Sequence, residues 1–222
     1  MSRPDLILWG LHGLLLKPFA SANDLADFYG VDEAIFPPVL ERLAESGWVG
    51  LRTGALQGWV LLPEGLARHD QLVADELAAS GSRSRIEDCY HRFGVLNPRL
   101  LDLCTRWQVH DGGDGGISLN THEDPVHDKR LIDELGRLDE QVQPVCHELG
   151  LCLKRYAHYS SRLTGALKLV KDGVVEWFAG ATIASYHTVW FELHTDLLAT
   201  LGLDRATETA KATRCGTSTS WG

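Results

Sequence analysis

The hydrophobic positions of this chain recur with two different periods. In most segments apolar side chains return every three or four residues, which is the period of an amphipathic helix, whereas residues 48–52 and 57–62 alternate as strands do. The short polar stretch between these two segments predicts that they pair as one hairpin. We expect helices over residues 4–17, 22–29, 32–46, 64–79, 83–93, 97–109, 124–143, 151–170 and 181–201.

The ends of several expected helices carry residues that start or stop a helix. Ser21 and Asp124 are favourable N-caps, because their side-chain oxygens accept hydrogen bonds from the first free backbone N–H groups. Gly30 and Gly202 are favourable C-terminal stops, because glycine adopts the left-handed conformation easily. Pro144 is expected to end or kink its helix.

Three segments are expected to depart from regular helix. Two consecutive prolines at 37 and 38 predict a late start or a distorted first turn for the helix over 32–46. The glycine-rich stretch 110–123 predicts a loop. The residues after 204 are rich in Thr, Ala and Ser and predict a flexible tail.

The order helix, turn, helix and hairpin within residues 21–65 is typical of a winged helix-turn-helix. Almost everything that follows predicts helix. The sequence therefore predicts a mainly α fold with a winged helix-turn-helix domain over 1–80, an all-helical ligand-binding and dimerisation domain over 81–204, and a flexible tail over 205–222.

Three motifs carry a resemblance to a known family. They are Val39-Leu40-Glu41-Arg42-Leu43, Ser46-Gly47-Trp48-Val49 and Gly58-Trp59-Val60-Leu61-Leu62-Pro63-Glu64-Gly65. Through them, residues 5–80 resemble the MarR-type winged-helix regulators. The whole plan, with residues 166–173 and His187, is more distantly similar to the FadR type of the GntR group. These resemblances imply a regulator that reads DNA with its first domain and binds a small molecule with its second.

The charge balance qualifies this interpretation. The chain has 21 Lys and Arg against 30 Asp and Glu, a formal net charge of −9, which argues against a protein that coats nucleic acid. The expected reading helix over 32–46 holds four acidic residues and a single arginine. The residues expected to face DNA are Arg42, Arg52, Thr53 and Gln57. Few phosphate contacts are available from this set, so DNA is a partner with weak electrostatic attraction.

Three functional hypotheses remain open. The favoured one is a ligand-responsive, DNA-binding transcriptional regulator, which is not an enzyme and acts as a homodimer. The alternative is an enzyme or small-molecule-binding protein that keeps the regulator scaffold and has lost DNA binding. A third is a protein-interaction module that uses the acidic helix over 32–46 as its surface.

A candidate ligand pocket follows from the helical half. The final expected helix carries two histidines and a tryptophan on one otherwise apolar face, and the helix over 151–170 places an arginine beside two tyrosines. An arginine next to buried tyrosines suits a ligand carboxylate or phosphate, whereas under the enzyme hypothesis the histidines would act as acid or base. The candidate residues are Trp107, Tyr156, Tyr159, Arg162, His187, Trp190, Glu192 and His194.

Cofactor and compartment signals are sparse. No cofactor motif is present, and His122 and His127 are weak candidates for a metal site at the start of the helix over 124–143. The five cysteines form no C-x-x-C pair and predict reduced thiols in a cytoplasmic protein. No apolar run reaches the roughly 18 residues that span a bilayer, so no membrane partner is expected.

Overall fold

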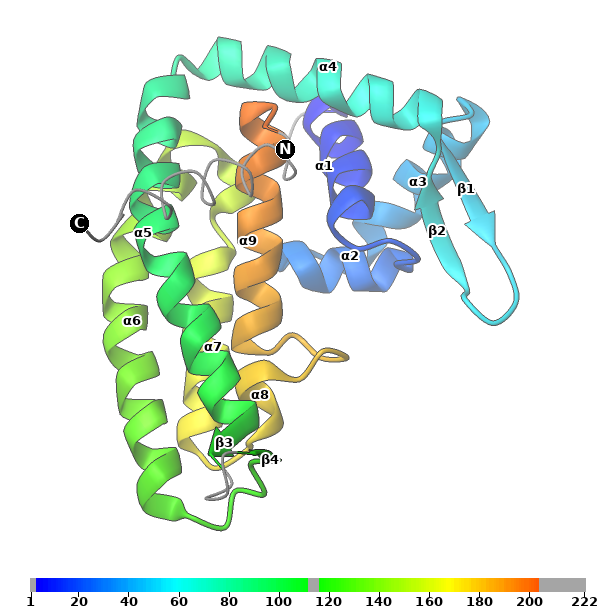
Figure 1. The fold of residues 1–222 in the computed structure, drawn as a ribbon. Helices are drawn as coiled ribbons and strands as arrows, with labels where there is room; N and C mark the ends of the chain where they lie inside the picture. The colour runs from blue at the N-terminus through cyan, green and yellow to red at the C-terminus, as the bar shows by residue number, and fades with distance from the viewer. Residues whose placement is uncertain (1–2, 112–115, 204–222) are drawn as a thin grey trace, which may run out of the picture. The chain divides into compact units, whose positions relative to one another are not determined.

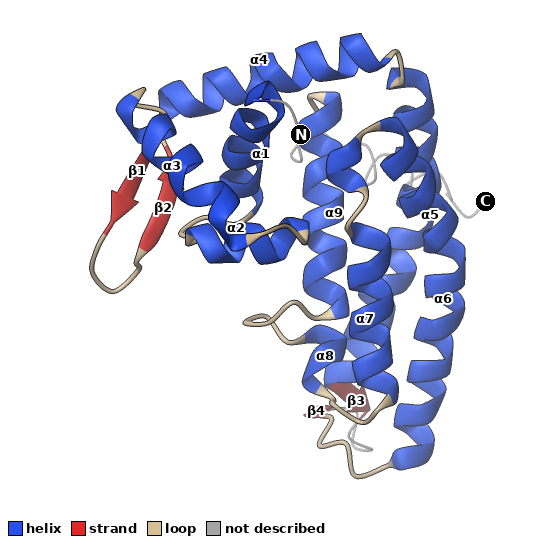
Figure 2. Cartoon of the chain, turned by 180° about the vertical axis from the view of Figure 1, so that it is seen from behind, coloured by secondary structure: helices blue, strands red, loops and turns tan. Residues whose placement is uncertain are grey.

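The structure is a computed structural model that describes residues 3–111 and 116–203. It is mainly helical, with 73% helix, and its strands form two short antiparallel pairs (Figure 1, Figure 2). The chain divides into two compact units, one with the described residues up to Arg83 and from His194 onward, the other with Ser84–Leu193. The expected tail over 205–222 lies outside the described residues.

The first unit contains the helices that its sequence predicts. Asp24 N donates to Ser21 Oγ over 3.1 Å, and Ser21 N donates to the Asp24 carboxylate over 2.7 Å, so the two residues form a capping box. Gly30 ends the same helix at φ 66°. The described helices of this unit before Arg83 are α1 (Arg3–Leu16), α2 (Ala22–Tyr29), α3 (Phe36–Glu45) and α4 (Pro63–Ser80).

Helix α3 starts later than the expected residue 32. A short 3-10 turn, η1 (Glu33–Ile35), comes first, and the Asp32 carboxylate accepts the N–H of Ala34 over 2.8 Å. The α-helix then begins at Phe36, and the two prolines fall in its first turn, where a missing N–H breaks no helical bond. The distorted start expected from the prolines is confirmed, and the boundary at residue 32 is wrong.

The predicted hairpin is present as β1 (Val49–Arg52) and β2 (Gly58–Leu61), with Val49 opposite Leu61 and Arg52 opposite Gly58. The segment before α2 pairs with it, because Phe19 N donates to Trp59 O and Trp59 N to Ala20 O, each over 2.9 Å. Gly58 lies at φ 143°, and a Cβ there would be 1.8 Å from Phe19 O. Only glycine fits this position.

The core of the first unit forms around α1, which packs against α2, α3, α4 and β2. Leu11, Leu25 and Leu40 are fully buried. Burial of each such side chain contributes roughly 1.5–3 kcal/mol. Tyr29 stacks on Trp9 with ring centroids 4.6 Å apart and donates its hydroxyl to Trp9 O over 3.0 Å. These contacts fix α2 against α1.

The second unit is a set of long helices with one small hairpin. Its elements are α5 (Arg83–Gln108), β3 (Val109–Asp111), β4 (Ile117–Leu119), α6 (Pro125–Cys152), the 3-10 turn η2 (Lys154–Tyr156), α7 (Tyr159–Lys171), α8 (Glu176–Ala179) and α9 (Tyr186–Leu201). Helix α9 continues past Leu193 into residues of the first unit. Among the described helices, none is both long and apolar enough to span a bilayer.

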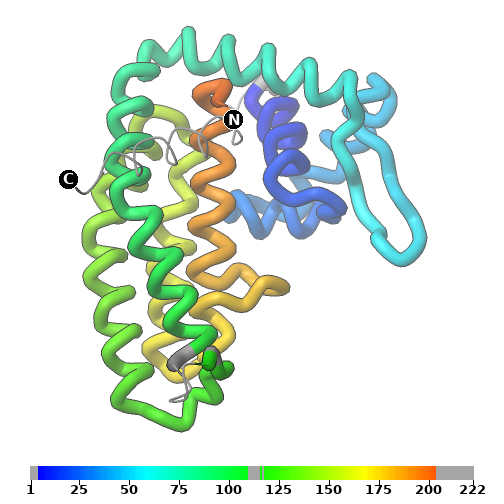
Figure 3. The backbone as a smooth tube through the Cα atoms, viewed as in Figure 1, coloured from blue at the N-terminus to red at the C-terminus, as the bar shows by residue number. Residues whose placement is uncertain are grey.

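Two helices of the second unit run through prolines where the sequence predicts a boundary, a helix start at 97 and a helix end or kink at Pro144. Helix α5 is continuous across Pro98, and α6 is continuous across Pro144. Figure 3 draws both helices as unbroken coils of the backbone. A proline inside a helix costs about 3 kcal/mol. Here the apolar stripe on each side of the proline stays on one buried face, as Leu96 and Leu100 do in α5. Tertiary packing therefore overrides the local preference.

Other boundaries also differ from expectation. Leu153 is extended at φ −138°, so α6 ends at Cys152 and the helix expected over 151–170 begins only at Tyr159. The last helix begins at Tyr186, where Ser185 Oγ accepts the N–H of Thr188 over 3.2 Å. Part of the expected loop over 110–123 pairs as β3 and β4, and α8 is an additional short helix.

Candidate functional site

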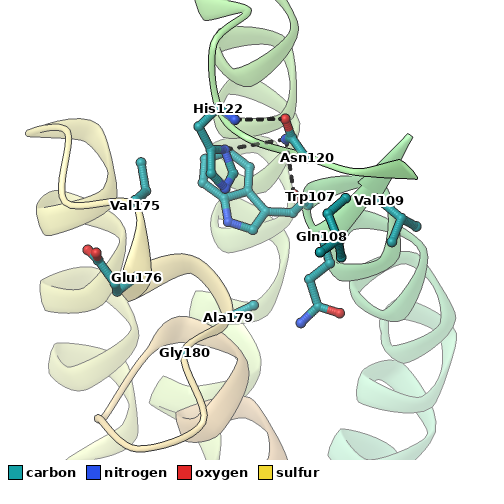
Figure 4. A pocket seen from close by; sticks show the side chains of 10 residues that line it. Trp107, Gln108, Val109, Asn120, His122, Val175, Glu176, Ala179 and Gly180 are labelled. Atoms are coloured by element: carbon teal, nitrogen blue, oxygen red, sulfur yellow. Dashed lines mark hydrogen bonds between the residues drawn. The ribbon is translucent and has the colours of Figure 1, made fainter. Parts of the chain in front are cut away.

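A groove opens in the second unit where α5 meets the β3–β4 hairpin and α8. It has a volume of about 440 Å³, within the range of small-molecule sites (Figure 4). Its lining residues are Trp107, Gln108, Val109, Leu119, Asn120, His122, Val175, Glu176, Ala179 and Gly180. The groove is mostly apolar, with a few polar groups from two sides.

Asn120 connects the elements that form one wall of this groove. Its side-chain N–H2 donates to Trp107 O over 3.0 Å and to Asp128 Oδ1 over 3.2 Å, while its oxygen accepts the backbone N–H of His122 over 3.0 Å. The end of α5, the hairpin and the start of α6 are therefore held by one amide. This is a pre-organised arrangement, because each contact restricts the same few side chains.

His122 is the most constrained residue in the groove. Its backbone is left-handed at φ 59°, which is uncommon for a residue other than glycine. Its Nδ1 lies 2.9 Å from Asp128 Oδ2, and its ring lies over Trp107 with centroids 4.4 Å apart. Trp107 in turn stacks on Phe178 at 4.2 Å. The imidazole is thus fixed by a carboxylate at one edge and by an indole at one face.

The polar side chains of the groove include donors as well as acceptors, since Gln108 and Asn120 carry amide N–H groups. Glu176 carries the only formal charge among the described lining residues, and neither lysine nor arginine occurs among them. Arg106, next to Trp107 in sequence, is held by Asp102 Oδ2 at 2.8 Å and Glu134 Oε2 at 2.6 Å. The described lining therefore contains one carboxylate and no cation, and Figure 4 draws that carboxylate pointing away from His122 and Trp107.

The candidate pocket residues from the sequence fall into separate places. Trp107 lines the groove, whereas Tyr156, Tyr159, Arg162 and Glu192 form a buried cluster of their own. Arg162 Nη2 lies 2.6 Å from Glu192 Oε2, and its guanidinium carbon lies 6.0 Å from the Tyr159 ring centroid. Tyr156 is fully buried. The arginine expected to clamp a ligand anion is already paired with a carboxylate.

The other candidates on α9 are in different environments again. Trp190 is buried, stacks near Phe93 with centroids 4.6 Å apart, and donates its indole N–H to Asn97 Oδ1 over 2.9 Å. His187 and His194 are half-buried. Burial lowers the pKa of His187 below its usual value, because the charged form loses hydration.

The structure gathers no metal site from the candidate histidines. Among residues 3–111 and 116–203, no group of three His, Cys, Asp or Glu side chains is placed to hold a metal ion. His122 instead pairs with Asp128, and His127 Nε2 lies 3.5 Å from Arg106 O. Cys89, Cys104 and Cys146 are buried free thiols, and burial raises the pKa of each to about 12, so they are poor nucleophiles.

The residues expected to face DNA all lie on the surface of the first unit. Arg42 is exposed on α3, and Arg52, Thr53 and Gln57 are exposed on the hairpin and its turn. Glu41 and Glu45 are exposed on α3 as well, so the acidic character of this helix persists in the folded protein.

A pair of buried histidines in the first unit was not predicted as a site. His12 Nδ1 lies 2.8 Å from His69 Nε2, and His12 Nε2 lies 3.0 Å from Asp196 Oδ1. Both imidazoles are fully buried. Each histidine occupies a position on the apolar face of its helix, and only this position in the sequence could have indicated that the two rings are buried. His69 also contacts the exposed Asp70, whose Oδ1 lies 2.9 Å from His69 Nδ1.

Comparison with known proteins identifies no relative. No family model, no curated protein and no solved structure matches this chain.

Proposed function

We propose that this chain is a ligand-responsive, DNA-binding transcriptional regulator that works as a homodimer in the cytoplasm. In this proposal α2, α3 and the β1–β2 hairpin act as a winged helix-turn-helix, and the groove beside Trp107 receives a small effector. The resemblance of residues 5–80 to MarR-type regulators is consistent with it.

One observation carries the proposal. The hairpin and its turn expose Arg52, Thr53 and Gln57 to solvent. The hairpin is joined to the segment before α2 by the backbone hydrogen bonds of Trp59 with Phe19 and Ala20. Arg42 is exposed on the preceding helix. A hairpin that displays these polar side chains, next to a helix with an exposed arginine, offers groups suited to phosphate and base-edge contacts.

The charges set the strength and salt dependence of such binding. Arg42 and Arg52 are the two cations among the four residues expected to face DNA, and four acidic residues lie between 32 and 46. The logarithm of the binding constant should fall with the logarithm of salt concentration with a slope of about −2 per protomer and about −4 for a dimer. A shallow slope distinguishes this surface from a strongly basic one.

The test uses the full chain and duplexes enriched from a random pool at low salt. Fluorescence anisotropy should show selective binding that Arg42→Ala and Arg52→Ala each weaken, together with the shallow salt slope. Arg130→Ala is the matched control, since Arg130 is an exposed arginine on α6 in the other unit. Failure to enrich any duplex, or equal effects of all three substitutions, would refute DNA binding.

A further inference from the structure

The hydrogen-bond geometry points to one added proton bound by the buried pair His12 and His69, which makes the contact of α1 and α4 with the second half of α9 sensitive to pH. The pair and its two carboxylate neighbours, Asp196 and Asp70, form what we call the proton-binding set. All four residues belong to the first unit. The inference does not depend on DNA binding, and it assigns a regulatory role to residues that the proposed function does not use.

Three contacts connect the four side chains of the set in one line. His12 Nε2 lies 3.0 Å from Asp196 Oδ1, His12 Nδ1 lies 2.8 Å from His69 Nε2, and His69 Nδ1 lies 2.9 Å from Asp70 Oδ1. Both nitrogens of each ring are therefore used. The two imidazoles are fully buried and the Asp196 side chain is 1% exposed, whereas the Asp70 side chain is 69% exposed. The line thus runs from a buried carboxylate to a carboxylate in solvent.

The number of hydrogens in this line determines its protonation state. A hydrogen bond at each contact needs one hydrogen, so three contacts need three. Two neutral imidazoles carry one ring hydrogen each, and two ionised carboxylates carry none. With only two hydrogens, one contact would bring two lone pairs together at hydrogen-bonding distance. The third hydrogen is therefore a proton taken from solvent, and it belongs to the set as a whole rather than to one ring.

The burial of the set favours the same number. A carboxylate as buried as that of Asp196 is stabilised by a nearby positive charge, which the added proton supplies. A second added proton on the rings would make both imidazoles cationic, and two N–H groups would then face each other across the 2.8 Å contact between His12 and His69. The set is therefore complete with one added proton, and it is incomplete with none and repulsive with two.

Other described charged groups on the surrounding elements lie nearer to solvent than the two rings. The acidic and basic side chains of α2 and α3 are exposed, and β2 has none. The half-buried ionisable groups are Asp5 in α1, Lys17 just after it, Arg68 and Glu76 in α4, and His194 in α9. The Thr200 hydroxyl, 3.1 Å from Asp196 Oδ1, is a neutral neighbour of the buried carboxylate.

The added proton makes the stability of the first unit depend on pH. An imidazole in an unfolded chain has a pKa of about 6.5, so between about pH 7 and about pH 8 both rings are mostly neutral when the chain is unfolded. The folded set holds one proton more in this interval, so the folded state loses stability as pH rises. When the proton leaves, one contact loses its hydrogen and the Asp196 carboxylate loses its nearby positive charge. The packing of α9 on α1 is then weakened.

The test compares the wild type with two variants that supply the third hydrogen from an amide. In Asp196→Asn the side-chain N–H2 can donate to His12, and in Asp70→Asn it can donate to His69, so two neutral rings then complete the line. Urea denaturation of the full chain, followed by circular dichroism, gives the folding equilibrium constant at about pH 7 and about pH 8. Between these values the constant should fall up to tenfold more in the wild type than in either variant, as expected for one proton.

Two controls accompany this comparison. Asp75→Asn should keep the wild-type pH dependence, because Asp75 is an exposed carboxylate of the same helix as Asp70 and takes no part in the three contacts. The buried thiols, whose pKa burial raises to about 12, are present in every variant, so their contribution cancels in the comparison. Asp70 is exposed, so Asp70→Asn keeps the test decisive even if Asp196→Asn does not fold.

Amide hydrogen exchange in residues 194–201 gives a second readout. After correction for the intrinsic rate, exchange should accelerate more between about pH 7 and about pH 8 in the wild type than in Asp70→Asn. The inference is overturned by an equal pH dependence of folding in the wild type and Asp70→Asn, by an equal loss of that dependence in Asp75→Asn, or by equal acceleration of exchange. A chain that binds no duplex but meets these expectations refutes the regulator alone, because no DNA is present in the experiment.

Discussion

The buried ion pair between Arg162 and Glu192 gives the sharpest test of the energetics of the helical unit. The side chains are 16% and 5% exposed, and the nearest nitrogen and oxygen are 2.6 Å apart. At an effective dielectric constant of about 20 this separation gives an attraction of about 6 kcal/mol, which is offset by a desolvation cost of several kcal/mol for each ion. The attraction between Arg162 and Glu192 therefore roughly offsets the cost of burying both charges, whereas one of these charges buried without the other would have no such compensation.

Removing one partner should expose this imbalance. Arg162→Met should lower the free energy of unfolding by about 3–5 kcal/mol, because the Glu192 carboxylate stays buried without that cation. The double variant Arg162→Met with Glu192→Leu should cost less than Arg162→Met alone. Urea denaturation followed by circular dichroism measures these two variants and Glu192→Leu alone. A Glu192→Leu variant completes the double-mutant cycle.

An exposed pair provides the control for this cycle. Lys129 and Asp133 lie 2.9 Å apart on α6 with side chains 74% and 49% exposed, so Lys129→Met should change stability by less than about 1 kcal/mol. A loss of under about 1 kcal/mol for Arg162→Met, or a double variant as costly as the two single losses together, would show that solvent screens the buried pair as well.

The remaining predictions concern one glycine and one carboxyl group. Gly58→Ala should lower the free energy of unfolding by more than about 2 kcal/mol in urea denaturation, because the new Cβ would collide with Phe19 O. Gly54→Ala is the control, since Gly54 is also at positive φ but lies in open space, and it should cost only the backbone strain. Equal losses in the two variants would contradict this reasoning. Burial raises the pKa of the Asp139 carboxyl above its usual value of 3.8, so the native state favours the protonated form more than the unfolded state does. The free energy of unfolding of the wild type should therefore fall as pH rises from about 3.8 through the raised pKa. Asp139→Asn should therefore gain stability relative to wild type across that pH range, and a difference independent of pH would refute the reasoning.

The sequence was most informative where local chemistry determines the backbone. Helix α2 starts after Ser21 and ends at Gly30 as expected, because an N-cap and a left-handed C-terminal residue act within one helical turn. The hairpin was predictable for the same reason. The helix boundary expected between 93 and 97 and the helix end expected at Pro144 were wrong. The local cost of each proline is outweighed by packing of residues distant in sequence, which no window of neighbouring residues contains.

The candidate site was predictable only in part. Trp107 and His122 were both singled out, yet for different sites, and their contact at 4.4 Å depends on how the hairpin folds back onto α5. Glu176 was not singled out, because a helix as short as α8 carries no periodic pattern. Arg162 was expected to meet a ligand anion, but the sequence does not reveal that α7 and α9 bring Glu192 to the same place.

Helix α9 has a consequence for the order in which this protein matures. Its first half belongs to the second unit, but its second half belongs to the first, where Asp196 lies 3.0 Å from the buried ring of His12. A ribosome synthesises His12 before residues 84–193 and Asp196 only after all of them. The amino-terminal unit therefore stays incomplete in the nascent chain until α9 emerges, and a gene fragment that stops at residue 83 encodes a domain without its closing segment.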